Sequence, residues 1–116
     1  MVEKQRIKMV ERLKTLLAHE NDKRSYFIYG GYQSKPTIPY GNYARQESQY
    51  DYADDTLNVR INEYIVRVVT ATKDFELEEQ IEDVFIDLEI PFSVITDEDV
   101  ESEKVHCTEW YIACVD

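Results

Sequence analysis

The clearest hydrophobic pattern in the chain lies in its middle, over residues 64–88. Residues 64–70 are β-branched or aromatic on both faces except for Arg67, which is typical of a strand inside a sheet. After a short break, residues 74–88 repeat apolar side chains at helical spacing: Leu77, Ile81, Val84, Phe85 and Leu88. Asp74 stands where it can cap this segment. The pattern therefore predicts a central strand followed by an amphipathic helix.

The N-terminal part of the chain has another helical stripe and two short extended segments. Residues 2–20 carry apolar side chains on one face and basic side chains over much of the rest, so we expect a first amphipathic helix there. Residues 25–29 predict a short strand, which Gly30-Gly31 ends. Residues 40–46 follow closely on two prolines, and we expect them to pair only as an edge strand.

Two further strands are expected after the second helix, over residues 92–96 and 104–115. The second is a long alternating run in which Cys107 and Cys114 fall on opposite faces, so these cysteines cannot pair with each other. The acidic residues 97–102 are predicted to form the turn between the strands. We therefore predict an α+β fold with a mostly antiparallel sheet of about four strands and two amphipathic helices packed on one face.

The length of 116 residues allows one hydrophobic core, and we expect a single domain over residues 1–116. Residues 47–60 mix acidic and aromatic side chains without a period, which predicts a long loop or a hairpin extension. The chain has no apolar run near the length of a membrane span, and its N-terminus is charged. We accordingly expect a cytosolic protein that does not enter a membrane.

The net charge of −11 is distributed unevenly along the chain. Residues 1–70 hold 11 Lys or Arg against 9 Asp or Glu, a balance of +2, whereas residues 71–116 hold 2 against 15, a balance of −13. Such an acidic protein should be repelled by phosphate backbones, so we expect no sequence-specific binding of nucleic acid. The basic part of one copy could meet the acidic part of another; alternatively, the acidic surface only maintains solubility.

Motifs that carry chemistry are sparse. The segment that begins at Asp51 resembles a calcium loop only faintly, because its third, sixth and twelfth positions lack the required residues. The run Asp97-Glu98-Asp99 is more simply a solvated group of carboxylates than a cation site. His106 cannot activate Cys107, since neighbouring side chains on a strand point to opposite faces. We therefore predict no catalytic residue, no metal site and no cofactor, and a protein that is not an enzyme.

Tyrosine is unusually frequent in the middle third of the chain. Seven of the nine tyrosines fall there: Tyr26, Tyr29, Tyr32, Tyr40, Tyr43, Tyr50 and Tyr52. Tyrosine suits half-buried contact surfaces with a wet edge. Any single tyrosine is more simply explained by packing on the sheet, whereas the set, next to the long loop, could equally form a protein interface.

Five segments give the chain a characteristic order: Tyr52-Ala53-Asp54-Asp55, residues 64–68, residues 72–78, Ile81-Glu82-Asp83 and Glu101-Ser102-Glu103-Lys104. In this order the chain resembles the small tail terminator or head–tail joining proteins of long-tailed bacteriophages and prophages, over about residues 26–115. The resemblance implies a non-enzymatic α+β protein that forms a ring, commonly a hexamer, at the head-proximal end of the tail tube. It also implies a virion protein that assembles in the host cytoplasm with the tail-tube protein and a head connector or stopper protein, while DNA passes through without specific binding.

A ring requires different surfaces of neighbouring copies to meet. We expect Arg12 and Lys14 on the first helix to contact Glu78 and Glu82 on the second helix of the next copy. The expected lumen or tube-contact loop contains Asp51, Tyr52, Asp54 and Asp55.

Two alternatives remain from the sequence. The first is a small acidic protein that mimics DNA and inhibits a host nuclease or defence complex, with carboxylates at phosphate-like spacing. The second is an unspecialised adaptor domain whose partner the sequence does not identify. A mimic would stay a monomer or dimer and bind a basic host protein, whereas a tail protein would assemble with other tail proteins.

Overall fold

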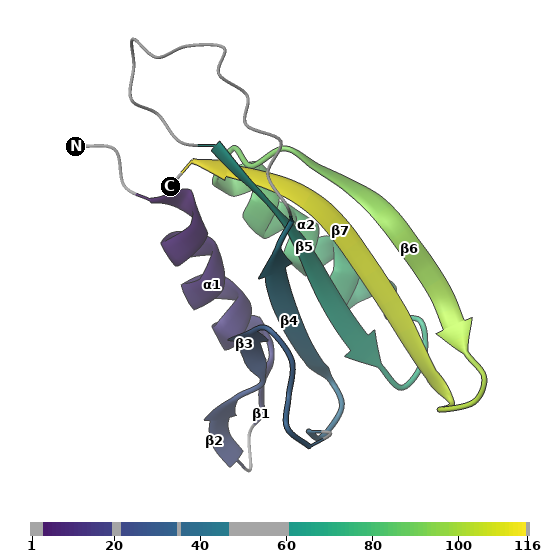
Figure 1. Cartoon of the computed structure of the whole chain (residues 1–116). Helices are drawn as coiled ribbons and strands as arrows, with labels where there is room; N and C mark the ends of the chain where they lie inside the picture. Colours follow the sequence, from purple (N-terminus) through teal and green to yellow (C-terminus); the bar gives the residue numbers. More distant parts are fainter. Residues whose placement is uncertain (1–3, 20–21, 35, 47–60, 116) are drawn as a thin grey trace, which may run out of the picture.

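The computed structural model describes residues 4–19, 22–34, 36–46 and 61–115 (Figure 1). In chain order its elements are α1 (Gln5–Leu16), β1 (Ala18–His19), β2 (Asp22–Ser25), β3 (Phe27–Tyr29), β4 (Tyr40–Arg45), β5 (Ile61–Thr70), α2 (Phe75–Asp87), β6 (Phe92–Val100) and β7 (Val105–Val115). Strands β1 and β2 form a small hairpin, and the other five strands form one sheet. The predicted loop of residues 47–60, with its four candidate contact residues, lies outside the described residues.

The main sheet has the order β3-β4-β5-β7-β6, with β5 in the centre. Strands β3 and β4 are parallel, and the other neighbours are antiparallel. The α+β class and the central strand are therefore confirmed, but a sheet of about four strands was wrong, because the sheet is mixed and has five. Strand β4 is also not an edge strand. Pro36 and Pro39 both precede it, so they remove no hydrogen-bond donor from residues 40–45.

Helix α2 connects two parallel strands that are not neighbours. Both β5 and β6 run antiparallel to β7, which lies between them, so α2 crosses over β7. The helix begins as predicted, since the Asp74 side chain accepts a hydrogen bond of 3.0 Å from the Leu77 backbone N–H. Its inward face buries the predicted apolar stripe, including Ile81 and Phe85. This placement brings the start of α2 next to the C-terminal half of β6 and the N-terminal half of β7.

Both helices cover the same face of the sheet, as predicted (Figure 1). Helix α1 buries Met9 and Leu13, while α2 packs against the aromatic side chain of Trp110 on β7. The start of α1 lies at the end of α2, because the Gln5 side-chain amide donates a hydrogen bond of 2.9 Å to the Leu88 carbonyl. The two helices therefore run antiparallel to each other.

Two predicted boundaries were wrong. Helix α1 ends at Leu16 instead of residue 20, and the chain then enters the β1–β2 hairpin. Strand β6 continues to Val100, so the carboxylates of residues 97–99 lie on a strand and not in the turn. Strand β7 is long enough to pair with them, and a bulge between Val94 and Thr96 shifts the register before they begin.

In the described part of the chain, the second face of the sheet has no helix over it. The Arg67 Nε atom donates a hydrogen bond of 3.2 Å to the Cys107 sulfur on this face. Cys114 lies on the helix-covered face, so the prediction of opposite faces is confirmed; both cysteines are buried, and neither forms a disulfide within the described residues.

Candidate functional site

The most concentrated set of polar side chains surrounds His106 on β7. This side chain faces the helices and has only 5% of its surface exposed. Its Nδ1 atom lies 2.8 Å from Asp99 Oδ1, and its Nε2 atom lies 2.6 Å from Asp97 Oδ1. Because each ring nitrogen meets a carboxylate oxygen, the arrangement favours the doubly protonated imidazolium. The hydrogen bond with Asp99 is the main cause that raises the pKa of His106; burial opposes it and Asp97 adds to it.

Lys73 extends this set of charges to helix α2. Its Nζ atom lies 2.6 Å from Glu78 Oε1 and 2.7 Å from Asp97 Oδ2. The hydrogen bond with Lys73, followed by that with His106, lowers the pKa of Asp97. For Lys73 itself, burial lowers the pKa, but the bonds with Asp97 and Glu78 outweigh it and the net shift is upward. We call the five side chains Glu78, Lys73, Asp97, His106 and Asp99 the ion network; it joins α2, β6 and β7.

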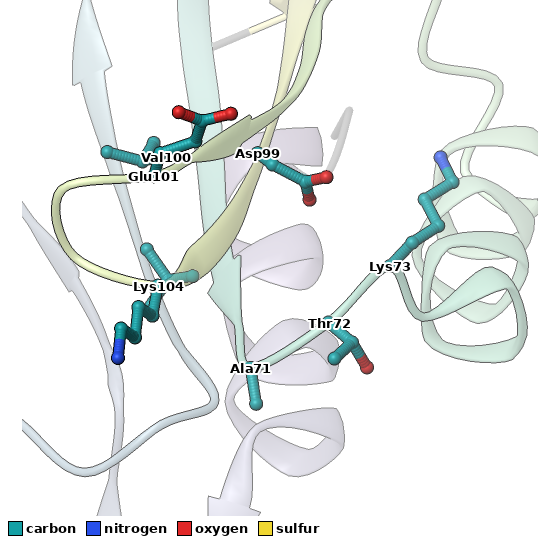
Figure 2. A pocket seen from close by; sticks show the side chains of 8 residues that line it. Ala71, Thr72, Lys73, Asp99, Val100, Glu101 and Lys104 are labelled. Atoms are coloured by element: carbon teal, nitrogen blue, oxygen red, sulfur yellow. The ribbon is translucent and has the colours of Figure 1, made fainter.

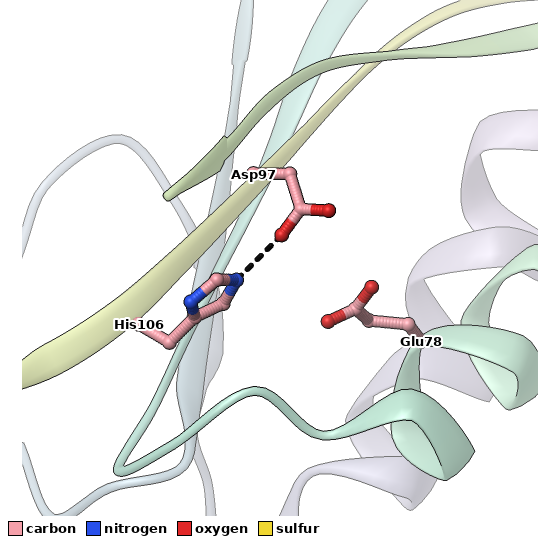
Figure 3. A group of neighbouring side chains, drawn as sticks. All are labelled: Glu78, Asp97 and His106. Carbon is pink, nitrogen blue, oxygen red and sulfur yellow. Dashed lines mark hydrogen bonds and ion pairs between the residues drawn. The ribbon is translucent and has the colours of Figure 1, made fainter. Parts of the chain in front are cut away.

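Three members of the ion network could in principle hold a metal ion. Glu78, Asp97 and His106 each offer a ligand atom, and these atoms lie within 4.8 Å of one another (Figure 3). One imidazole and two carboxylates suit a divalent transition metal. However, Lys73 already bonds both carboxylates, and Asp97 bonds the Nε2 atom that would bind the ion. A metal would have to displace an ammonium group and a proton, so the geometry fits a closed network of ion pairs better than a metal centre.

A shallow groove of about 460 Å³ lies beside the ion network (Figure 2). It lies between the loop of residues 71–73 and the turn of residues 101–104, and Lys73 and Asp99 contribute to its lining. Both of these ionic groups are already bonded within the ion network. Among the eight residues that line the groove, no nucleophile is paired with a base, so the groove has the features of a surface depression.

The predicted interface glutamates lie between α2 and the sheet of their own chain. Glu82 accepts a hydrogen bond of 2.9 Å from the Trp110 indole N–H, and Glu78 accepts one of 3.3 Å from the Thr108 hydroxyl. Arg12 forms an ion pair of 3.0 Å with Asp87, also within the chain. The attraction that we expected between a basic helix and an acidic helix of neighbouring copies is therefore already present within one copy. Lys14 remains exposed.

The tyrosines have more than one role. Tyr43 is buried and lies at the centre of an aromatic row across β3, β4 and β5, with ring-centroid distances of 5.0 Å to Tyr29 and 5.8 Å to Tyr64. Tyr32 donates a hydrogen bond of 2.6 Å to the Gly41 carbonyl. Tyr29 is the exposed end of the row. Packing on the sheet therefore accounts for part of the set, while Tyr50 and Tyr52 lie outside the described residues.

The two helices carry opposite charge. Helix α1 contains one acidic residue and four basic ones: Arg6, Lys8, Arg12 and Lys14. Helix α2 contains no basic residue and six acidic ones: Glu76, Glu78, Glu79, Glu82, Asp83 and Asp87. Helix α1 contacts the edge strand β3 and also β7, whereas α2 lies over β7 next to the other edge strand, β6 (Figure 1). Charge is thus separated across the width of the domain.

Two exposed surfaces, one on each helix, lie at the two sides of this separation of charge. The basic side surface is the flank of α1 turned away from α2, with Ile7 and Lys14, together with Tyr29 on β3. The acidic side surface is the solvent-facing side of α2 next to Glu82, together with the neighbouring part of β6: Phe75, Glu79, Ile86, Val94 and Ile95. These residues are all exposed. Of the predicted interface residues, only Lys14 belongs to one of these surfaces.

No protein-family model matches the sequence, and no curated protein matches it either. In the described part of the chain, neither helix has the length and apolar character needed to cross a membrane.

Proposed function

We propose that this protein is a non-enzymatic structural subunit of a bacteriophage or prophage tail, of the tail terminator or head–tail joining type. In this proposal it assembles as a ring, commonly a hexamer, at the head-proximal end of the tail tube and lets DNA pass. The structural observation that carries the proposal is the separation of charge between opposite sides of the domain. The resemblance of the sequence to this class of tail proteins supplies the biological setting.

A closed ring is built from contacts between two different surfaces of the same subunit. Those surfaces must lie on roughly opposite sides, so that each copy can bind one neighbour on each side. The basic flank of α1 and the acidic flank of α2 meet this requirement, since the helices lie side by side with their outer flanks turned apart. Complementary charges would steer the copies together and disfavour contact between two identical surfaces.

The ion network supports a structural role for the most polar part of the domain. Its charged groups are bonded to one another and connect three elements. Such a network fixes the C-terminal half of β6 relative to β7 and α2. A rigid subunit is suited to a ring in which each copy must present both surfaces in a fixed relation.

The test is the mass of the purified chain, alone and with the tail-tube protein of the same phage. At low salt we expect an assembled species, of about 83 kDa if six copies of the 13.8 kDa chain form the ring. Native mass spectrometry gives the copy number, and electron microscopy shows whether the particles are annular. A chain that remains monomeric at high concentration and does not bind tail-tube subunits would overturn the proposal.

The alternative proposal is a DNA-mimic inhibitor of a host nuclease or defence complex. The observation that favours it is the row of carboxylates on α2, next to those of Asp97 and Asp99 on β6. Such an inhibitor would bind a basic host protein as a monomer or dimer and compete with DNA. Competition with duplex DNA for a host nuclease, without ring formation, would favour it over the tail protein.

A further inference from the structure

Most of the exposed large hydrophobic side chains lie along the two side surfaces. Of the eight described, Ile7 and Tyr29 belong to the basic side surface, and four belong to the acidic one: Phe75, Ile86, Val94 and Ile95. Single exposed apolar residues are common, but a group of them rimmed by charge indicates a contact site. Both side surfaces thus combine apolar side chains with charge, and the charges have opposite sign.

The outer flank of α2 is defined by its hydrogen bonds. Asp87 faces α1, because it pairs with Arg12, whereas Glu82 faces β7, because it bonds Trp110. Glu79 and Ile86 lie three and four residues from Glu82, and residues at these spacings share a helix flank. At 100° per residue, Ile86, with 60% of its surface exposed, and Glu79 lie about 100° and 80° around the helix from Asp87, so they project to solvent between the α1 side of α2 and Glu82.

The outer flank of α1 follows from the same reasoning. Gln5 and Arg12 face α2, since they bond Leu88 and Asp87. Ile7 and Lys14 lie roughly 140° and 160° around the helix from Arg12, at 100° per residue. They therefore lie on the flank that is turned away from α2, and both are exposed.

We infer that the ring contact joins the outer flank of α1 to the solvent-facing side of α2, with Lys14 of one copy against Glu79 of the next and Ile7 against Ile86. This inference rests on the proposed ring. The helices of one chain are antiparallel, and rotation about a ring axis that runs along the helices keeps their directions, so in such a ring α1 of one copy also runs antiparallel to α2 of the next. Ile7 and Lys14 are two helical turns apart, about 10.5 Å, as are Glu79 and Ile86. Both contacts can therefore form together.

The occupant of each surface is thus a second copy of this chain. Charge complementarity favours it, since Lys14 stands on the basic helix and Glu79 on the acidic one. Apolar residues surrounded by pairs of opposite charge are the usual arrangement of a protein interface. Strand β6 adds Val94 and Ile95 to the acidic side surface, and β3 adds Tyr29 to the basic one, so the contact extends beyond the helices.

The decisive experiment is a charge exchange. We expect Lys14→Glu and Glu79→Lys each to raise the concentration for half-assembly about tenfold at low salt, because each places like charges together. The double variant K14E/E79K restores the opposite pair and should return assembly to near the wild-type concentration. Ile86→Asp should abolish assembly, since it places a carboxylate in the apolar part of the contact. Sedimentation velocity gives the concentration for half-assembly of the wild type and of these four variants.

Ile61→Asp is the matched control, because Ile61 is 64% exposed but lies on neither side surface. It should assemble as the wild type does, and circular dichroism should show that every variant is folded. If the wild type assembles and Lys14→Glu, Glu79→Lys and Ile86→Asp all assemble equally well, the inferred contact is wrong while the ring function stands. If the wild type forms no assembly, alone or with tail-tube subunits, both the contact and the proposed function are wrong.

Discussion

His106 and Asp97 lie nine residues apart on neighbouring strands, and a hydrogen bond of 2.6 Å joins the imidazole Nε2 atom to the carboxylate Oδ1 atom. Asp99 bonds the other ring nitrogen, so the histidine is held between two carboxylates that alternate along β6. Lys73 in turn bonds the second oxygen of Asp97. The C-terminal half of the edge strand β6 is thus held by ion pairs, and the stability of the protein should depend on pH.

The first prediction concerns that pH dependence. The folded pKa of His106 is raised, so its contribution to the free energy of unfolding is fully present below its ordinary pKa of 6.5 and is lost as the pH rises through the folded value. The pKa of Asp97 is lowered, so its contribution is present above 3.8 and is lost as the pH falls. The ion network should therefore be strongest between about pH 4 and 6.5. Urea unfolding from pH 4 to 9 should show this loss on the alkaline side, and His106→Gln should remove it. An unchanged alkaline slope in that variant would contradict the assignment.

A second prediction concerns Lys73, whose ammonium group lies between two carboxylates. Lys73→Met should lower the free energy of unfolding by about 1 kcal/mol, because Glu78 and Asp97 lose their shared partner near solvent. Lys104→Met is a suitable control, since this exposed lysine lies in the adjoining turn and should change stability by less than about 0.5 kcal/mol. Chemical denaturation at pH 6 gives the free energy of unfolding of both variants. An equal loss in the two would show that the ion pairs of Lys73 do not stabilise the protein.

A third prediction concerns the single tryptophan. Trp110→Phe should lower the free energy of unfolding by about 2 kcal/mol, because it leaves space in the core and removes the donor to Glu82. Glu82→Gln retains an oxygen acceptor for the indole N–H and should cost less than about 1 kcal/mol. Thermal denaturation followed by circular dichroism compares the two proteins without relying on tryptophan fluorescence. A larger loss in E82Q than in W110F would contradict this view of the contact.

A fourth prediction concerns the backbone of β4. A methyl group at Gly41 would lie 2.8 Å from the Arg67 carbonyl oxygen and about as close to Phe27, so Gly41→Ala should destabilise the protein by about 2 kcal/mol. Gly31→Ala is the control, because nothing lies within 4 Å of its added methyl group, and it should be close to neutral. Melting temperatures of the two variants provide the comparison, and a neutral G41A would show that the neighbouring strands can move apart.

The periodic parts of the chain could be predicted from sequence, and the charged contacts could not. The stripe that ends at Leu88 defined α2 closely, and alternation defined β7, because burial on one face leaves a direct pattern. The sequence predicts a turn for the acidic run of β6, since carboxylates are uncommon on strands, and the proximity of His106 follows only from the register of β6 and β7. Had the strand been extended to Val100, the alternation of Asp97 and Asp99 opposite His106 would have indicated the ion network.

Three of the predicted interface side chains, those of Arg12, Glu78 and Glu82, also form contacts within the chain. The sequence predicts a contact of Arg12 with a neighbouring copy because α2 is acidic, but the fold also places α2 beside α1 of the same chain, where Asp87 pairs with Arg12. Which flank of an amphipathic helix faces its neighbour depends on tertiary packing, and the sequence pattern defines only the face that is buried. Lys14, two residues further along, lies on the opposite flank and stays exposed.

The bulge at Ile95 and the three carboxylates after it also bear on how large an assembly can become. A long, flat, uncharged edge strand can recruit further strands without limit and lead to fibres. On β6 the bulge interrupts the line of backbone donors and acceptors, and a second copy of the strand would bring Asp97, Glu98 and Asp99 against identical charges. Growth by adding strands is therefore disfavoured at this edge of the sheet, which limits fibre formation through β6.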